Sequence, residues 1–291
     1  MRLFGNRDEY NGKFRIHIVN NKDRIQLALQ ICSLLISLVT IACIFCYHGL
    51  YKPVLFEKDD VLGGACVPAG VPDFKAEDRA LIQWYVHTMK ELQVEIHLGT
   101  AVTEEMLRGL TFDVLIIATG ATPRVFDLGK GIPVYDAKSV LKNNAAGLGE
   151  NLVVLGGGTV GCELALWLRE SFGKNVTIVE AQKDILQLNA PLCSANKDML
   201  AALVRFKGCV IRANTVAKQV TDAGVILHDQ KSGEETELKA DAVIVAAGFR
   251  CDTALYQAMQ DVPELYAIGD CRECRNIHQA IWDAYEVANH I

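Results

Sequence analysis

A chain of 291 residues with 51% apolar and 22% charged side chains can bury a large core and is long enough for one or two domains. Its net charge of −6 leaves no excess of basic residues to follow a phosphate backbone, which argues against nucleic-acid binding. The ten cysteines are scattered through apolar runs, unlike those of a secreted disulfide scaffold. The composition is that of a globular protein with small-molecule partners.

The first element in chain order is an uncharged apolar run at residues 25–47, long enough to cross a bilayer as a helix of about 20 residues. Three basic residues precede it closely, Arg15, Lys22 and Arg24, and only Lys52 and Lys58 follow. This bias favours a cytoplasmic N-terminus, so a membrane helix would export the rest of the chain. A membrane anchor is therefore one interpretation of an atypical segment that covers residues 1–52.

From Pro53 onward, short β-branched runs alternate with amphipathic helices, which predicts an α/β fold with a parallel sheet and crossover connections. The helix expected at residues 77–92 carries a stripe of Leu81, Trp84, Tyr85, Thr88 and Leu92, which should pack on the sheet. The predicted strands are residues 53–57, 94–98, 113–119, 151–156, 175–180, 209–213 and 241–247.

The sequence VVLGGGTVGCE places the pattern GxGxxG, formed by Gly156, Gly158 and Gly161, directly after an apolar strand. In this pattern the first glycine makes a tight turn, the second lets a pyrophosphate approach the backbone, and the third lets helix and strand approach each other. The apolar helix expected at residues 162–168 would direct its N-terminus at the phosphates. This stretch predicts a dinucleotide site.

An acid stands where a ribose-binding residue is expected, because Glu180 closes the next strand 19 residues after Gly161. A carboxylate there accepts hydrogen bonds from both ribose hydroxyls and repels a 2′-phosphate. The spacing favours NADH over NADPH, although Lys183 lies close enough to soften the preference.

Five motifs in order resemble the two-dinucleotide flavoprotein reductases: LFEKDDVLGG, LIIATGATPR, VVLGGGTVGCE, VIVAAGFR, and LYAIGDC with the residues that follow it. The likeness is to the C-terminal part of the NADH:flavin oxidoreductases of the Old Yellow Enzyme family, the group of 2,4-dienoyl-CoA and 2-enoate reductases. It implies two Rossmann-like domains, with an NAD(H)-binding domain at residues 126–248 inserted in an FAD-binding domain at residues 53–125 and 249–291.

The resemblance also implies roles for single residues. Glu57 corresponds to the acid on the FAD adenosine ribose and Asp270 to the carboxylate at the ribityl or pyrophosphate end, while Glu163 lies near the nicotinamide. The helix that starts near Ile277 would direct its N-terminus at the flavin ring. The remaining cofactor-binding residues expected from the matched motifs are the glycines and threonine Gly63, Gly64, Thr119, Gly120, Gly248 and Gly269.

The implied chemistry is hydride transfer from NADH to the flavin N5, in which the cofactors react and the protein orients them. No catalytic side chain is expected. Cys66 belongs to no CxxC or CxxxxC pair, so the redox disulfide of the glutathione-reductase branch is absent. The pairs Cys43/Cys46 and Cys271/Cys274 each stand alone, and we interpret them as coincidence and packing, with no metal site.

The sequence departs from the family at the first βαβ unit of the FAD domain. A second GxGxxG is expected near residues 32–37, but no glycine occurs between Gly12 and Gly49. Without that loop, FAD binding is expected to be much weaker than in the family.

Three accounts of residues 1–50 remain: a true membrane helix, a scrambled segment, or a substitute strand at residues 14–19 before one long helix. We favour the scrambled segment, because it explains the lost glycines, the conflict of topology and the abrupt return of the motifs at Pro53 together.

The family's FMN-binding barrel and iron–sulfur cysteines are also not found, so the chain is expected to be an electron-input module with an unknown acceptor domain or protein. Two alternatives stay open, a non-catalytic NADH-binding remnant and a membrane-tethered reductase. The expected location is the cytoplasm, with membrane association as its alternative.

Overall fold

The computed structural model describes residues 52–143, 145, 147–187 and 193–291. The apolar run 25–47 and the candidate strand 14–19 lie outside these residues, so their interpretation stays a prediction. Within the described part, no helix is both long and apolar enough to cross a membrane.

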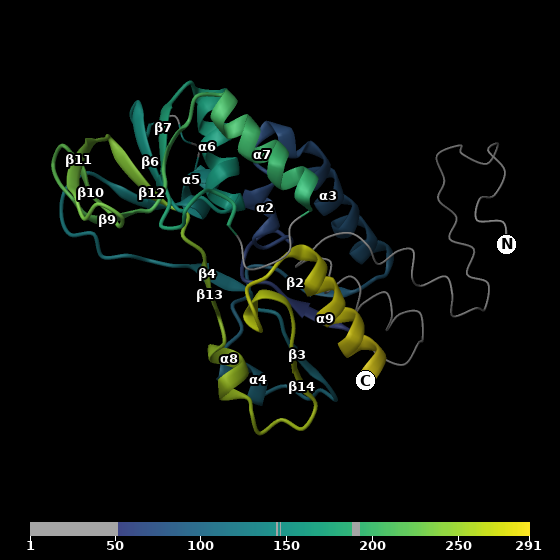
Figure 1. Cartoon of the computed structure of the whole chain (residues 1–291). Coiled ribbons are helices and arrows are strands. Elements are labelled where there is room, and N and C mark those ends of the chain that lie inside the picture. The colour runs from purple at the N-terminus through teal and green to yellow at the C-terminus, as the bar shows by residue number, and fades with distance from the viewer. Residues whose placement is uncertain (1–51, 144, 146, 188–192) are drawn as a thin grey trace, which may run out of the picture. The chain divides into compact units, whose positions relative to one another are not determined.

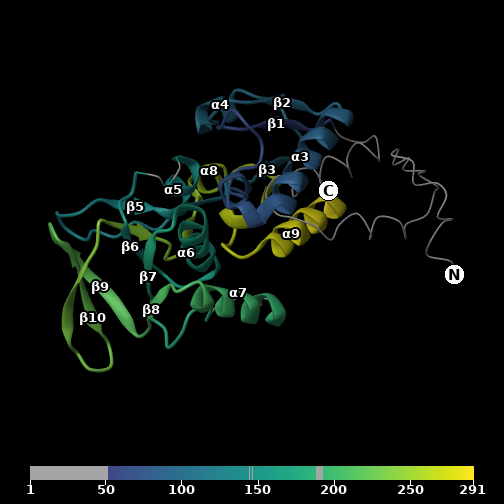
Figure 2. The same cartoon turned by 90° about the horizontal axis from the view of Figure 1, so that it is seen from above.

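The largest sheet has five parallel strands in the order β5-β12-β6-β7-β8 (Figures 1 and 2). Four of them confirm predicted strands to within two residues, and β5 was not predicted. Their bounds are β5 Val134–Asp136, β6 Asn151–Leu155, β7 Asn175–Val179, β8 Val210–Arg212 and β12 Ala242–Val245.

This sheet is buried on both faces, because its central strands are apolar at successive positions rather than at alternate ones. On one face, Leu152 and Val154 of β6 pack with helices α5 (Ala137–Asn143), α6 (Thr159–Phe172) and α7 (Ser194–Phe206). On the other face, Val153 and Leu155 pack against a second sheet. The layers can be followed in Figures 1 and 2.

The second sheet is antiparallel, in the order β11-β10-β9. It was not predicted, because its strands are polar on the exposed side and signal the core only through alternate residues such as Val225 and Leu227. The bounds are β9 Thr215–Val220, β10 Gly224–Asp229 and β11 Glu235–Lys239.

Outside these two sheets, the structure has two separate pairs of parallel strands, β1-β2 and β3-β14. Among the described residues, no strand pairs with the second edge of β1 or of β3. A strand that lay between them would pair with both edges at once. The bounds are β1 Val54–Phe56, β2 Glu95–His97, β3 Leu115–Ile117 and β14 Leu265–Ala267.

The predicted helix at residues 77–92 is α3 (Ala76–Glu91), and Tyr85 and Met89 pack it against Leu55 of β1. Trp84 differs from the predicted stripe: it is 51% exposed and meets the edge of the Tyr85 ring. The reason is geometric, because Trp84 lies about 100° around the helix from Tyr85.

An antiparallel ribbon of β4 (Ala121–Pro123) and β13 (Phe249–Cys251) carries the chain out to the five-stranded sheet and back. The other described elements are α2 Cys66–Ala69, η3 Asp73–Lys75, α4 Glu104–Arg108, α8 Ala254–Ala258, η4 Gly269–Cys271 and α9 Ile277–His290. The start of α9 is where the sequence predicts it.

Candidate functional site

The glycine turn leaves β6 at the carboxyl edge of the five-stranded sheet. The sheet extends from β6 to β7 and β8 on one side and to β12 on the other, so β6 is the strand at which the strand order reverses. In parallel sheets, ligands bind beyond the carboxyl ends of strands at such a point.

Two glycines of the motif are required by the packing. Gly156 has φ +107°, and a Cβ there would lie 2.6 Å from the carbonyl oxygen of Ala246. A Cβ on Gly161 would lie 1.9 Å from the carbonyl oxygen of Gly156. The first glycine therefore makes the turn and the third brings α6 against the loop, as the pattern predicts.

The second glycine, Gly158, is the N-cap of α6, and its backbone is extended at φ −71° and ψ −172°. The helix begins at Thr159, three residues earlier than expected, and runs to Phe172. The N–H groups of the first turn of α6 therefore lie directly beside the glycine turn. Such an end attracts anions through its unpaired donors and the helix dipole.

Glu180 follows β7 and holds the turn in place. Its Oε2 accepts a hydrogen bond from the backbone N–H of Gly157 at 2.6 Å, and its Oε1 accepts one from Gln182 at 2.7 Å. Each carboxylate oxygen has a second lone pair, so the group can still accept from a ligand. The structure thus brings Glu180 to the glycine turn from the adjacent strand.

The other two residues expected at this site are placed differently. Gly248 follows β12 at the same edge, with φ +94°, and its carbonyl accepts from Arg124 N–H at 3.1 Å. Glu163 of α6 forms an ion pair with Lys75 of η3, with 2.8 Å between Oε1 and Nζ. Although burial of the ammonium acts in the opposite direction, this carboxylate raises the pKa of Lys75.

A cavity of about 1450 Å³ lies between the two divided strand pairs. Its lining comes from β1, β2, β3, α4, α8 and α9. The structure places six residues expected to hold FAD along it, namely Glu57, Gly63, Gly64, Thr119, Gly120 and Asp270. Gly269 is buried directly beside Asp270.

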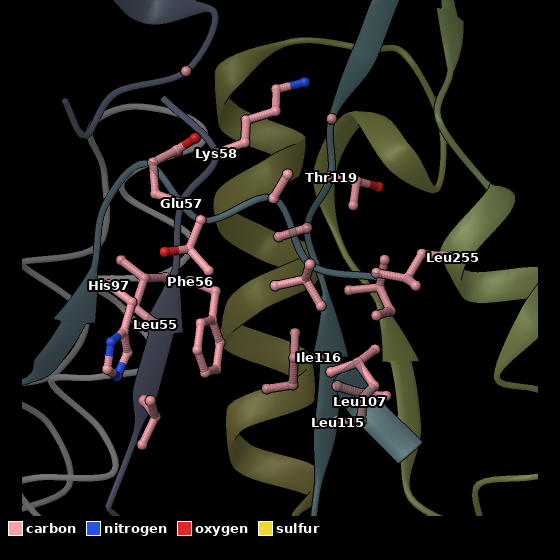
Figure 3. A pocket seen from close by; sticks show the side chains of 18 of the residues that line it. Leu55, Phe56, Glu57, Lys58, His97, Leu107, Leu115, Ile116, Thr119 and Leu255 are labelled. Carbon is pink, nitrogen blue, oxygen red and sulfur yellow. The ribbon is translucent and has the colours of Figure 1, made fainter. Parts of the chain in front are cut away.

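Figure 3 shows how this cavity changes in character along its length. Glu57, Lys58 and Thr119 stand at one end, where β1 and β3 terminate, whereas apolar side chains such as Phe56 and Ile116 line the space between the strands. The polar end offers partners for sugar or phosphate groups. The apolar body has the lining of a sheet interior.

Glu57 and Glu180 are equivalent in the two halves of the fold. Each acid follows a parallel strand, and each accepts from the backbone N–H two residues further on, Asp59 at 2.9 Å for Glu57 and Gln182 for Glu180. Only Glu180 also accepts from a glycine turn on the neighbouring strand. Among the described residues, Glu57 has no such partner.

The loop that carries Asp270 is fixed by an acid that the sequence analysis missed. Asp283 of α9 is buried, and its carboxylate accepts from Gly269 N–H at 3.0 Å, from Arg272 at 3.0 Å and from Arg275. The available signal was an acid beside the apolar stripe of α9, preceded by two arginines. Lys75, the partner of Glu163, gave no comparable signal.

Asp270 itself is partly buried, and burial raises the pKa of its carboxyl, although the N–H and charge of Arg275 act in the opposite direction. Burial makes the ionised form of this carboxyl less favourable than it is in water, and carboxyls perturbed in this way are common at functional sites. Among the described residues, no cluster of three or more His, Cys, Asp or Glu is arranged to hold a metal ion.

A glycine turn at the reversal point of a parallel sheet, joined to an acid on the next strand, defines a dinucleotide-binding α/β protein. Comparison with known proteins identifies the class more closely. Residues 103–284 match the family described as pyridine nucleotide-disulphide oxidoreductase, and the chain belongs to that family. Proteins of this family bind FAD and NADH.

One curated relative, the cinnamate reductase of Clostridium sporogenes, is 44% identical over 242 residues, which is 83% of this chain and 36% of the relative. Among solved structures, a 2-naphthoyl-CoA reductase in complex with 2-naphthoyl-CoA superposes with a TM-score of 0.75 at 26% identity, covering 87% of this chain and 38% of that one.

The thioredoxin reductase of Lactococcus lactis superposes with a TM-score of 0.68 at 20% identity, over 88% of this chain and 94% of that one, and so supports the fold alone. The predicted resemblance to the two-dinucleotide reductases and their enoate-reductase group is confirmed. The chain spans little more than a third of the length of the larger reductases that it matches.

Proposed function

We propose that this chain is an NADH-binding oxidoreductase domain that passes a hydride from NADH to a flavin. The observation that carries the proposal is the hydrogen-bonded unit of the glycine turn and Glu180 at the carboxyl edge of the five-stranded sheet. It supplies a helix N-terminus for a pyrophosphate and a carboxylate for a ribose.

When bound, the two cofactors supply the hydride chemistry between the nicotinamide and the flavin N5. The residues of this chain bind and orient them. Gly156, Gly158 and Gly161 shape the NADH pyrophosphate site, and Glu180 selects against a 2′-phosphate. No side chain is required as nucleophile or base.

The FAD site of the proposal is the polar end of the cavity, with Glu57 and Asp270 at its two limits. Its support is the gathering of six expected residues along one cavity. We accordingly assign residues 126–248 to NADH and residues 53–125 with 249–291 to FAD, because residues 126–248 contain the five-stranded sheet with the glycine turn and the antiparallel sheet that packs on it.

Replacement of Gly158 by Val tests the NADH site. A branched side chain at the N-cap of α6 should exclude the pyrophosphate and weaken NADH binding by at least about 100-fold, as measured by calorimetry or fluorescence. Gly147→Val is the matched control, because a Cβ at Gly147 meets nothing within 4 Å. Unchanged NADH affinity in Gly158→Val would place the site elsewhere.

A second candidate function is NADH binding without bound FAD. The sequence favours it, because no glycine occurs between Gly12 and Gly49, where the loop for the FAD pyrophosphate is expected. Flavin absorbance of the purified protein separates the two functions: a yellow protein with stoichiometric flavin supports hydride transfer, and a colourless one supports the second candidate.

We propose that the final electron acceptor is a separate domain or protein and that the chain works in the cytoplasm, where NADH is available. Residues 25–47 provide the alternative of a membrane tether. Extraction of cell membranes with alkaline carbonate tests this: release into the supernatant supports the cytoplasmic location, and retention in the pellet contradicts it.

A further inference from the structure

Two cysteines that are 23 positions apart in the sequence meet beside the cavity. The Sγ atoms of Cys251 and Cys274 lie 3.5 Å apart, and both side chains are partly exposed. The distance is that of two sulfurs in contact, and a bond of about 2.05 Å requires them to approach by roughly 1.5 Å. Rotation about the Cα–Cβ bonds can supply a movement of that size.

The pair is not the one that the sequence suggests. Cys271 and Cys274 form the CxxC pattern, but the buried thiol of Cys271 donates to the carbonyl oxygens of Ile117 at 3.0 Å and Ile268 at 3.1 Å. Cys274 instead faces Cys251 of β13, and its thiol also lies 3.7 Å from the carbonyl oxygen of Asp270. In the folded chain, the cysteine nearest to the thiol of Cys274 is therefore Cys251 and not Cys271, its neighbour in the CxxC pattern.

The two sulfurs belong to segments that form different walls of the cavity. Cys251 is opposite Ala121 in the β4–β13 ribbon, and Asp252 next to it bonds to Gly120 through its N–H at 3.0 Å. Cys274 follows Asp270 by four residues, in the loop that Asp283 holds. Gly120, Ala121, Asp252 and Asp270 all line the cavity. A bond between the two sulfurs would fasten these walls to each other.

We propose that Cys251 and Cys274 are a redox-active dithiol that a low-molecular-weight disulfide, such as glutathione disulfide, converts to an intramolecular disulfide. One cysteine attacks glutathione disulfide, whose S–S bond breaks, and one glutathione leaves as a thiol. The second cysteine then attacks the protein sulfur of the mixed disulfide, and the second glutathione leaves. Two cysteines are oxidised, glutathione disulfide is reduced to two glutathiones, and the two cysteine protons end on the released thiols.

The surroundings make the first of these steps slow. Burial raises the pKa of the Cys274 thiol to about 12, the adjoining Cys251 thiol and the Asp270 carboxylate act in the same direction, and Arg124 opposes them. Little thiolate is then present at neutral pH. The second step is intramolecular between sulfurs already in contact, so a mixed disulfide should not accumulate.

The test is an equilibrium measurement, which does not depend on the slow step. The full chain is incubated in glutathione buffers from both the reduced and the oxidised side, remaining thiols are blocked, and peptides are mapped by mass spectrometry. The same titration is repeated in urea, where the fold no longer holds the sulfurs together. We expect the equilibrium constant for the Cys251–Cys274 disulfide to be at least about tenfold larger in the native protein than in the unfolded one.

Variants locate the bond. Cys251→Ser and Cys274→Ser should each abolish the native disulfide, whereas Cys271→Ser, the matched change at the other cysteine of the CxxC pattern, should retain it. A native equilibrium constant no larger than the unfolded one would overturn the proposal. A disulfide that joins Cys271 to Cys274, or that survives in Cys251→Ser, would overturn it equally.

Discussion

Glu180 has two proposed roles, and the effect of its substitution on two cofactors separates them. The carboxylate orders the turn through Gly157, and its charge disfavours a 2′-phosphate. Damage to the turn affects NADH and NADPH alike, because both share the same pyrophosphate. The ratio of the two dissociation constants therefore reports only the charge.

We predict that the wild-type chain binds NADH at least about tenfold more tightly than NADPH, and that Glu180→Ala brings this ratio close to one. The two dissociation constants are measured side by side by fluorescence titration. Glu57→Ala, the equivalent acid of the other half, is the control and should leave the ratio unchanged. A wild-type ratio near one, or one that Glu180→Ala does not alter, would contradict the role of Glu180.

Asp270 is a partly buried acid whose ionisation is opposed by its surroundings. Burial raises the pKa of its carboxyl in the folded protein. A folded-state pKa above the unfolded value means that the ionised group opposes folding. This penalty is full above the folded-state pKa and disappears as the pH falls toward the unfolded value, about 3.9.

We therefore expect Asp270→Asn to raise the thermal unfolding midpoint of the cofactor-free protein by a few degrees at pH 7 and to lose this gain as the pH approaches 4. Thermal scans over that pH range measure the effect. Asp222→Asn, at an exposed acid, should change nothing. A midpoint that falls at neutral pH in Asp270→Asn would mean that the carboxylate stabilises the loop instead.

At the scale of elements, the contact between the β6 turn and α6 is the tightest in the candidate NADH site. Gly161 leaves no room for a methyl group, since the atom in the way is the backbone oxygen of Gly156 and cannot rotate aside. The two elements would have to separate to admit a side chain. The cost falls on the core of the five-stranded sheet, which α6 covers.

We predict that Gly161→Ala lowers the free energy of unfolding by about 3 kcal/mol, measured by urea denaturation. Gly147→Ala, at a position with open space around it, is the control and should be neutral or slightly stabilising. If Gly161→Ala unfolds at the same urea concentration as the wild type, α6 is packed less closely on the turn than the structure has it.

At the scale of the whole molecule, the two halves of the fold differ in completeness. The half that we propose binds NADH has every part that the pattern requires, namely central strand, glycine turn, helix and acid. The half that we propose binds FAD has the expected acids and a cavity, but no described strand lies between β1 and β3. A diphosphate buried without backbone donors loses several kcal/mol of hydration.

We therefore predict that the purified chain retains far less than one FAD per molecule through gel filtration and still binds NADH. The flavin absorbance of the protein peak, compared with its protein content, measures the first, and titration measures the second. Stoichiometric FAD in that peak would contradict the prediction and would show that residues 14–50 rebuild the missing unit.

The class of fold and the candidate NADH site could be predicted from the sequence because the signals for them are local. The alternation of strand and helix, the spacing of the glycines and Glu180, and the lack of glycine between Gly12 and Gly49 are all read from stretches of continuous sequence, whose geometry follows from backbone sterics. The family assignment rests on the same motifs, and the comparisons confirm it.

Other features depended on contacts between residues far apart in the chain, to which local sequence rules are blind. The antiparallel sheet of β9–β11 is defined by its pairing and by burial of one face. Asp283 is anchored to a loop that precedes its own helix, and Lys75 meets Glu163 across 88 positions of sequence. Cys274 contacts Cys251 and not its sequence neighbour Cys271.

The sequence by itself determined the class of fold and the kind of ligand, because backbone conformation and motif spacing act over a few residues. Only the tertiary structure decided which buried charges and thiols are partners, because that depends on how the packed elements bring distant side chains into contact.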